Sequence, residues 1–226
     1  MRLVCMLSCF AIFAAPLAGA EPAGDLTPVM TKRGKLLLSE DFAGGSIPSE
    51  WKVGKGTWEV KDGALKGREV AADQHAATIR RPLDLKNAIF QFSFKFDGGK
   101  TTHLSLNDSK GHVCRVTISE QGFQVRKDKP SKASDEKAEL LASSQVPFKA
   151  GEWYTMLIEL SGNELLAQVN DAHHAFGSAP GLERPKTNFG FPAAGDGIWF
   201  DNVKVWEAET NPAWPTAKAK LAAKKP

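Results

Sequence analysis

Cysteine is scarce in this sequence. Its 226 residues include three cysteines, and two of them, Cys5 and Cys9, lie in an apolar N-terminal stretch. If that stretch is removed, Cys114 remains without an intramolecular disulfide partner. Cys114 shares the phase of the apolar residues in HVCRVTIS, which favours a small buried core residue over a nucleophile. The sequence therefore predicts a fold held together by packing rather than by disulfides.

The sequence also contains few stretches with helical periodicity and few clusters of positive charge. Only SKASDEKAELLAS, residues 131–143, could form a helix, and strands do not alternate with helices. The net charge of +3 resides in residues 208–226, which hold four Lys and one Glu. The rest of the exported chain is close to neutral and has no basic stripe interleaved with aromatics, so nucleic-acid binding is not expected.

The first twenty residues have the features of a secretory signal. Arg2 precedes an apolar run over residues 3–15, and the small residues at 18–20 predict cleavage before Glu21. A membrane anchor would need a longer apolar stretch with a stop-transfer flank, and a lipoprotein would need Cys where Glu21 stands. We expect a secreted or periplasmic protein without a membrane span.

The remaining chain is predicted to have three parts. Residues 21–35 form an N-terminal linker, residues 36–207 form one domain, and residues 208–226 form a disordered tail rich in Lys and Ala. The tail could contact anionic glycans or a cell surface, or it could simply be solvated. A domain of this size suits a single all-β unit, and we expect a monomer.

Short alternating runs separated by turn signals fill the domain. Asp62 and Gly63 can supply the positive φ angles of a tight turn within TWEVKDGALKG. The other runs are ATIRR, AIFQFSFKF, THLSLND, HVCRVTIS, GFQVRKD, EWYTMLIELSG, ELLAQVND, TNFGF and IWFDNVKVW. Many strands with few helices predict an all-β sandwich or jelly roll.

Four consecutive runs, from AIFQFSFKF to GFQVRKD, place apolar side chains on one face and polar ones on the other. If these runs are neighbouring strands, one surface carries the polar side chains of Gln91, Lys95, His103, Ser105, Asn107, Arg115, Gln124 and Arg126. Trp153 is the candidate aromatic plate for a sugar ring. Such a surface suits a carbohydrate with hydroxyl, carboxylate or sulfate groups, although an ordinary solvated face explains the same pattern.

The sequence resembles a known family over residues 36–207. The resemblance is carried by LLLSEDFAGGSIPSEWKVGKGTWEVKDGALKG, GEWYTMLIELSGNELLAQVND and RPKTNFGFPAAGDGIWFDNVKVWEA. These segments look like the concanavalin A-like, laminin-G-like jelly rolls of exported bacterial proteins, and in particular like the family named for 3-keto-disaccharide hydrolase. The resemblance implies a jelly-roll sandwich of two antiparallel sheets that binds or processes glycans. It assigns no catalytic residue.

Asp201 stands in an unexpected place. Val203 and Val205 in IWFDNVKVW are predicted to point inward. Because residues two apart on a strand point to the same face, Asp201 is predicted to point inward as well. A buried carboxylate without a partner costs several kcal/mol. The resemblance implies a structural Ca²⁺ held between the first and last strands by backbone carbonyls and an acidic residue from each strand, here Glu40 or Asp41 with Asp201. The alternative is that Asp201 caps loop N–H groups or pairs with a Lys.

Carboxylates and histidines do not form a complete catalytic motif. A retaining glycosidase needs two carboxylates about 5 Å apart, and the E-x-D-x-x-E strand that supplies them in related jelly rolls is missing. Glu159 and Glu164 could serve as an acid or base, or could be simply solvated. His173 and His174 are adjacent and would point to opposite sides of an extended segment, which argues against a zinc site.

A lyase would need a Tyr or His to move protons and an Arg or Gln to neutralise a uronate. The sole tyrosine, Tyr154, is predicted to point inward. His103 with Arg115 and Gln91 could take these roles, but no lyase motif surrounds them.

Three functions therefore remain open. The first is a secreted lectin-like domain that binds an oligo- or polysaccharide through the polar face and Trp153. The second is a glycoside hydrolase of the 3-keto-disaccharide type, and the third is a cell-surface interaction domain without a glycan ligand. The missing catalytic motifs favour the first, and the length of the resemblance favours the second.

Overall fold

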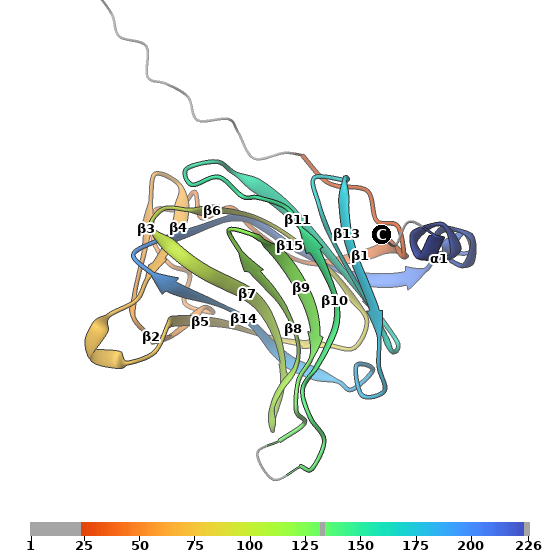
Figure 1. Cartoon of the computed structure of the whole chain (residues 1–226). Coiled ribbons are helices and arrows are strands. Elements are labelled where there is room, and N and C mark those ends of the chain that lie inside the picture. The colour runs from red at the N-terminus through yellow and green to blue at the C-terminus, as the bar shows by residue number, and fades with distance from the viewer. Residues whose placement is uncertain (1–23, 132–133, 224–226) are drawn as a thin grey trace, which may run out of the picture.

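Two antiparallel β-sheets packed face to face form the protein (Figure 1). The computed structural model describes residues 24–131 and 134–223. Sheet A has the order β13 (His173–Ser178), β12 (Glu164–Val169), β11 (Tyr154–Ser161), β6 (Ala88–Phe96), β15 (Ile198–Thr210), β4 (Ala64–Arg68) and β3 (Thr57–Lys61), and β1 (Thr31–Glu40) also pairs with β15. Sheet B has the order β10 (Glu139–Gln145), β9 (Gly122–Lys127), β8 (Gly111–Ser119), β7 (Gly99–Asp108), β14 (Lys186–Gly195), β5 (Ala77–Leu85) and β2 (Lys52–Lys55). The predicted jelly-roll sandwich is confirmed.

Phenylalanine side chains fill the space between the sheets. Phe90, Phe92, Phe94 and Phe96 of β6 are all buried, as their alternation predicts. The Phe191 ring of β14 lies 5.0 Å from Phe92 and 4.6 Å from Phe200 between ring centroids, which ties sheet B to sheet A. Each fully buried Phe stabilises the fold by about 1.5–3 kcal/mol relative to an exposed one.

Cys114 of β8 belongs to the same core, as predicted. Its side chain is buried, and that burial raises the pKa of the thiol to about 12. The thiol is therefore protonated at neutral pH and unsuited to nucleophilic chemistry.

The chain crosses from sheet A to sheet B between β6 and β7. The four runs from AIFQFSFKF to GFQVRKD are predicted to share one sheet. This prediction is wrong for AIFQFSFKF, which is β6 of sheet A, whereas the other three runs lie in sheet B. Both edges of β6 are occupied by β11 and β15, which are distant in sequence. Gly98, with φ 80°, and Gly99 make the turn, and a Cβ on Gly99 would lie 2.3 Å from Ile198 Cγ1. Strand order thus depends on long-range pairing that alternation does not encode.

A β-bulge at Asn202 changes the phase of β15. The pairing with β6 shifts between Asp201 and Lys204, and Asn202 has φ 49°. Phe200 and Val203 both point into the core as a result. Asp201 lies on the outer face instead of the predicted inner face. The bulge adds one residue to β15, so the side chains before it point to the opposite face from the one that the alternation after it predicts.

Both ends of the described chain pack on the outside of sheet A. Residues 24–30, here called the N-terminal strap, lie across β6, β11 and β12, where a linker was predicted. β15 continues to Thr210, and helix α1 (Trp214–Ala223) follows beside β1 and β13 (Figure 1). The predicted disorder of residues 208–226 is therefore wrong for the described part.

Two further sequence expectations concern helices and the N-terminal segment. The part of the possible helix over residues 131–143 that begins at Glu139 is strand β10. The predicted signal, residues 1–20, lies outside the described residues. Among the helices of the described chain, none has the length and apolar character needed to cross a membrane.

Candidate functional site

Neighbouring strands of sheet B carry a continuous polar row on their outer side. The row runs from Arg80 of β5 through Gly190 of β14 and Ser105 of β7 to Arg115 of β8 and Arg126 of β9. A second row pairs His103, Thr117 and Gln124 on β7, β8 and β9. We call these two rows the basic face.

A cavity of about 160 Å³ opens in this face. Its lining includes Gly190, Pro192, Arg80, His103 and Arg115. A Cβ at position 190 would lie 2.6 Å from the carbonyl oxygen of Ile79, so a glycine is needed for the close approach of the strands. His75, Ala76, Thr78, Ile79, Ser105, His112 and Phe191 complete the described lining. The cavity thus offers imidazoles, hydroxyls and guanidiniums, and no carboxylate among these residues.

An ion pair fixes the orientation of Arg115. Its Nε donates to both Oδ1 and Oδ2 of Asp128 at 3.0 Å, and its Nη2 also donates to Oδ1. The Asp128 side chain is 5% exposed and the Arg115 side chain is 30% exposed. The bidentate geometry holds the guanidinium rigidly at the edge of the cavity.

Two of the three histidines that line the cavity, His103 and His112, are held in the neutral state. Burial, and to a smaller extent the charge of Arg115, lower the pKa of His103 from 6.5 to about 3. The pKa of His112 is lowered for the same two reasons, although the Asp128 carboxylate raises it in part. The two rings lie 6.5 Å apart between centroids. At neutral pH both imidazoles therefore have one unprotonated nitrogen that can accept a hydrogen bond.

A chain of amides sets the tautomer of His112. Asn107 Nδ2 donates to Asn188 Oδ1 at 2.7 Å, which leaves Asn107 Oδ1 as the partner of His112 Nδ1. Nδ1 therefore carries the hydrogen in the neutral ring, and Nε2 carries the free lone pair.

Most of the polar residues predicted from sheet B strands gather on this face. His103, Arg115, Gln124 and Arg126 are half-buried on its surface. Ser105 is buried and donates to the carbonyl of Gly190, and the buried Asn107 holds His112. The sequence interpretation missed Arg80, His75, His112 and Gly190. Arg80 lies within the recognised ATIRR run, but nothing local indicates that β5 neighbours β14.

Gln91, Lys95 and Trp153 do not belong to the basic face, because β6 and β11 lie in sheet A. Gln91 is buried under the N-terminal strap, where its Oε1 accepts from Leu26 N at 2.8 Å. Lys95 Nζ lies 4.8 Å from the ring centroid of Trp153 and 4.7 Å from that of Trp199. Their predicted place on one surface with His103 and Arg115 is wrong.

The carboxylates of the predicted calcium ligands accept hydrogen bonds from nearby backbone N–H groups. Glu40 Oε1 accepts from Phe42 N at 2.9 Å, Asp41 Oδ1 from Ala43 N at 3.0 Å, and Asp201 Oδ1 from Asn202 N at 2.6 Å. Within the described residues, no three Asp, Glu, His or Cys side chains converge as metal ligands. The alternative of N–H capping by Asp201 is observed, and a Ca²⁺ site at Glu40 or Asp41 with Asp201 stays a prediction.

The two candidate acid or base residues anchor the ends of the chain. Glu159 is fully buried and accepts four hydrogen bonds, from the backbone N–H groups of Val29, Met30 and Thr31 and from Thr31 Oγ1. Glu164 accepts from Trp214 Nε1 at 2.7 Å and pairs with Lys218 of α1. These carboxylates act as structural acceptors.

The predicted inward direction of Tyr154 holds for its ring, which stacks at 5.9 Å on Phe94. Its hydroxyl reaches the surface, where it donates to Glu152 and accepts from Lys149 N, each at 3.0 Å. Tyr154 lies in sheet A and cannot serve the cavity of sheet B.

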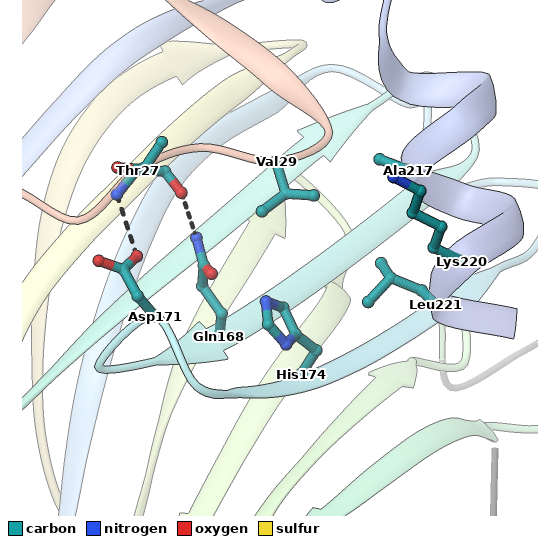
Figure 2. Close-up of a pocket in the computed structure, with 8 residues that line it drawn as sticks. All are labelled: Thr27, Val29, Gln168, Asp171, His174, Ala217, Lys220 and Leu221. Atoms are coloured by element: carbon teal, nitrogen blue, oxygen red, sulfur yellow. Dashed lines mark hydrogen bonds between the residues drawn. The ribbon is translucent and has the colours of Figure 1, made fainter. Parts of the chain in front are cut away.

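A second cavity, of about 430 Å³, lies between the N-terminal strap, the β12–β13 hairpin and α1 (Figure 2). Gln168 Nε2 donates to the carbonyl of Thr27 at 2.7 Å, and Thr27 N donates to Asp171 Oδ1 at 3.1 Å. His174 and Lys220 line the same space. Because Gln168 and Asp171 hold the strap in place, the basic face remains the stronger candidate for function.

These observations define a jelly-roll protein with a basic, histidine-containing cavity on one sheet. The chain belongs to the family of 3-keto-alpha-glucoside-1,2-lyase-like domains, whose model matches residues 39–206. This match confirms the resemblance found in the sequence. No protein with a curated description matches the chain.

Solved structures share the fold at low sequence identity. The carbohydrate-binding module CBM66 from Bacillus subtilis is 15% identical with a TM-score of 0.58, over 70% of this chain and 96% of that chain. The laminarinase from Rhodothermus marinus is 13% identical with a TM-score of 0.59, over 77% of this chain and 97% of that chain. An endo-β-galactosidase from Clostridium perfringens that releases GlcNAcα1-4Gal is 12% identical with a TM-score of 0.60, over 80% of this chain and 65% of that chain.

Proposed function

We propose that this protein binds a carbohydrate on the basic face, with one sugar unit in the cavity between Arg80 and Arg115. The observation that carries the proposal is the lining of that cavity, which combines neutral imidazoles and a guanidinium fixed by Asp128. Such groups recognise hydroxyl oxygens and hydroxyl hydrogens of a sugar ring. The family membership and the shared fold with CBM66 support a carbohydrate ligand.

The second candidate function is cleavage of a glycoside by elimination. The family is described by a lyase that acts on a 3-keto-α-glucoside across C1 and C2. In such a reaction a base removes the C2 proton, and the electron pair forms an enolate with the 3-keto oxygen. The enolate then collapses to a C1–C2 double bond, the C1–O bond breaks, and the leaving oxygen takes up the proton from the base, which releases an alcohol. The neutral His103 or His112 would accept the proton, and Arg115 would stabilise the enolate oxygen.

Hydrolysis by a pair of carboxylates fits the cavity less well than elimination. That mechanism needs an acid and a second carboxylate on opposite sides of the scissile bond. The described residues that line the cavity include neither Asp nor Glu, and Asp128 behind them is engaged by Arg115. We therefore place elimination ahead of hydrolysis as the enzymatic alternative.

Calorimetry of the protein against neutral, uronate and 3-keto oligosaccharides tests both functions. We expect saturable binding that falls by about tenfold or more in His103→Gln, because one to two hydrogen bonds to the sugar are lost. Trp153→Ala is the matched control on the opposite sheet and should leave affinity unchanged. Heat that continues until a 3-keto substrate is consumed, with rising ultraviolet absorbance from an unsaturated ketone, would indicate the lyase.

The opposite pattern would assign the ligand to another surface. If Trp153→Ala abolished binding while His103→Gln retained it, the outer face of sheet A would be the binding site. If no saccharide bound to or reacted with the folded protein, the proposed function would be wrong.

A further inference from the structure

Cations on the basic face follow one line across the strands. The paired positions Arg80, Gly190, Ser105, Arg115 and Arg126 lie on five adjacent strands. Because adjacent strands are about 4.8 Å apart, the backbones of Arg80 and Arg115 are separated by roughly 14 Å, and Arg126 lies about 5 Å further on. Gly190 and Ser105 are the two small residues between Arg80 and Arg115, and they leave space for the cavity between the two guanidiniums.

Two of these guanidiniums have no partner among the described residues. Arg115 is neutralised by Asp128, but Arg80 and Arg126 make no hydrogen bond or ion pair with the described chain. Arg126 Nε is moreover buried without an acceptor. A buried donor that lacks an acceptor raises the free energy of the unliganded protein, and an added acceptor would remove that cost.

The outer face of sheet A shows a different arrangement. There Lys66 pairs with Asp97 at 2.9 Å, Lys204 pairs with Asp25 at 2.6 Å, and Lys218 pairs with Glu164. Arg68 of β4 is exposed on the same face and also has no hydrogen bond or ion pair with the described chain. The basic face is therefore set apart by guanidiniums that lie in line on both sides of a cavity.

We infer that the ligand of the basic face is an acidic saccharide that lies across the strands, with carboxylate or sulfate groups bound by Arg80 and Arg126. The inference rests on the proposed carbohydrate-binding function and names its ligand class. Guanidinium groups bind planar carboxylates and sulfates through paired N–H donors. One sugar unit occupies the cavity, and the acidic groups lie on the units to either side of it.

A uronate oligosaccharide and its methyl ester provide the test, because they differ only in charge. Their affinities for the full chain are measured by calorimetry at low and at physiological salt. We expect the acid to bind at least about tenfold more tightly than the ester, with an advantage that shrinks at higher salt. Arg80→Gln and Arg126→Gln should each weaken binding of the acid by about five- to tenfold and leave the ester unaffected.

Lys61→Gln is the matched control, because it removes one exposed positive charge from the β3–β4 hairpin of sheet A. It should leave both affinities unchanged. Thermal unfolding of each variant confirms that it is folded. A sulfated oligosaccharide that binds while the uronate does not would support the inference with sulfate as the acidic group.

Three results would overturn the inference. Equal affinity for the acid and the ester, unaffected by Arg80→Gln and Arg126→Gln, would mean that the face binds neutral sugars, and the proposed function would stand. Poly-glutamate that binds as tightly as the uronate would mean unspecific attraction of polyanions. Absence of binding by every saccharide would reject the proposed function together with the inference.

Discussion

At the residue scale, Asn202 determines which face of β15 carries Asp201. Asn202 has φ 49°, a left-handed conformation that Asn and Gly adopt more readily than other residues. Its side-chain Nδ2 lies 3.3 Å from Asp201 Oδ2, and its backbone N donates to Asp201 Oδ1 at 2.6 Å. The bulge therefore turns Asp201 outward and supplies its carboxylate with donors at the same time.

Substitutions at Asn202 should separate backbone strain from side-chain contacts. We expect Asn202→Val to lower the free energy of unfolding by about 2 kcal/mol, because a β-branched side chain is strained at positive φ. Asn202→Gly should change it by less than about 0.5 kcal/mol, because glycine adopts this φ freely. Urea unfolding measures both values. Equal losses in the two variants would mean that the contact of Nδ2 with Asp201, and not the φ angle, stabilises the bulge.

At the scale of elements, the β11–β12 hairpin fastens the N-terminal strap and α1. Glu159 accepts three consecutive backbone N–H groups of residues 29–31, and Glu164 holds Trp214 and Lys218. The strap in turn buries Gln91, and it is held to the segment between β15 and α1 by Asn211, whose Nδ2 donates to the carbonyl of Val29 at 2.9 Å. Segments beyond the family domain of residues 39–206 thus complete the outer side of sheet A.

Removal of the Glu159 charge should loosen the strap. In Glu159→Gln, part of the acceptor set for the buried N–H groups is replaced by an amide NH₂, and we expect a loss of about 3 kcal/mol in the free energy of unfolding. Glu164→Gln is the matched control, since its ion pair is partly exposed and should contribute about 1 kcal/mol or less. Hydrogen exchange should show faster exchange at residues 29–31 in Glu159→Gln. Unchanged exchange there would refute the anchoring role.

At the scale of the whole molecule, buried neutral histidines link stability to pH. Burial and Arg115 lower the pKa of His103 to about 3, whereas the ordinary value of 6.5 applies after unfolding. Below pH 6.5 the unfolded chain therefore binds a proton that the folded chain does not bind. Stability must then fall as the pH falls from about 6.5 toward 3, and the lowered pKa of His112 acts in the same direction.

His103→Gln should flatten this dependence. We expect the wild-type free energy of unfolding to fall between pH 7 and pH 5 with a slope of at most about 1.4 kcal/mol per pH unit for each histidine. This window avoids Asp97, whose pKa is lowered from 3.8 by hydrogen bonds from Lys66 and Trp199 and which acts only at lower pH. Urea unfolding at pH 7, 6 and 5 provides the measurement. An identical slope in the variant would mean that His103 is protonated in the folded protein.

Much of the fold and part of the site could be predicted from the sequence. Alternation identified the inward Phe residues of β6, the buried Cys114 and the polar residues His103, Arg115, Gln124 and Arg126. These predictions succeed because successive side chains of a strand point to opposite faces, so a short run of sequence contains the information.

The remaining features were decided by the tertiary structure. Strand β6 pairs with β11 and β15 and not with its neighbour in sequence, β7, and this pairing depends on contacts between distant segments. As a result Gln91, Lys95 and Trp153 lie apart from the basic face. The bulge at Asn202, the place of Arg80 beside Gly190 and the use of Glu159 as an anchor also depend on distant segments. The sequence alone thus determined which side chains alternate, and the packing of two sheets determined which of them meet, because sheet pairing is set by long-range contacts and not by local periodicity.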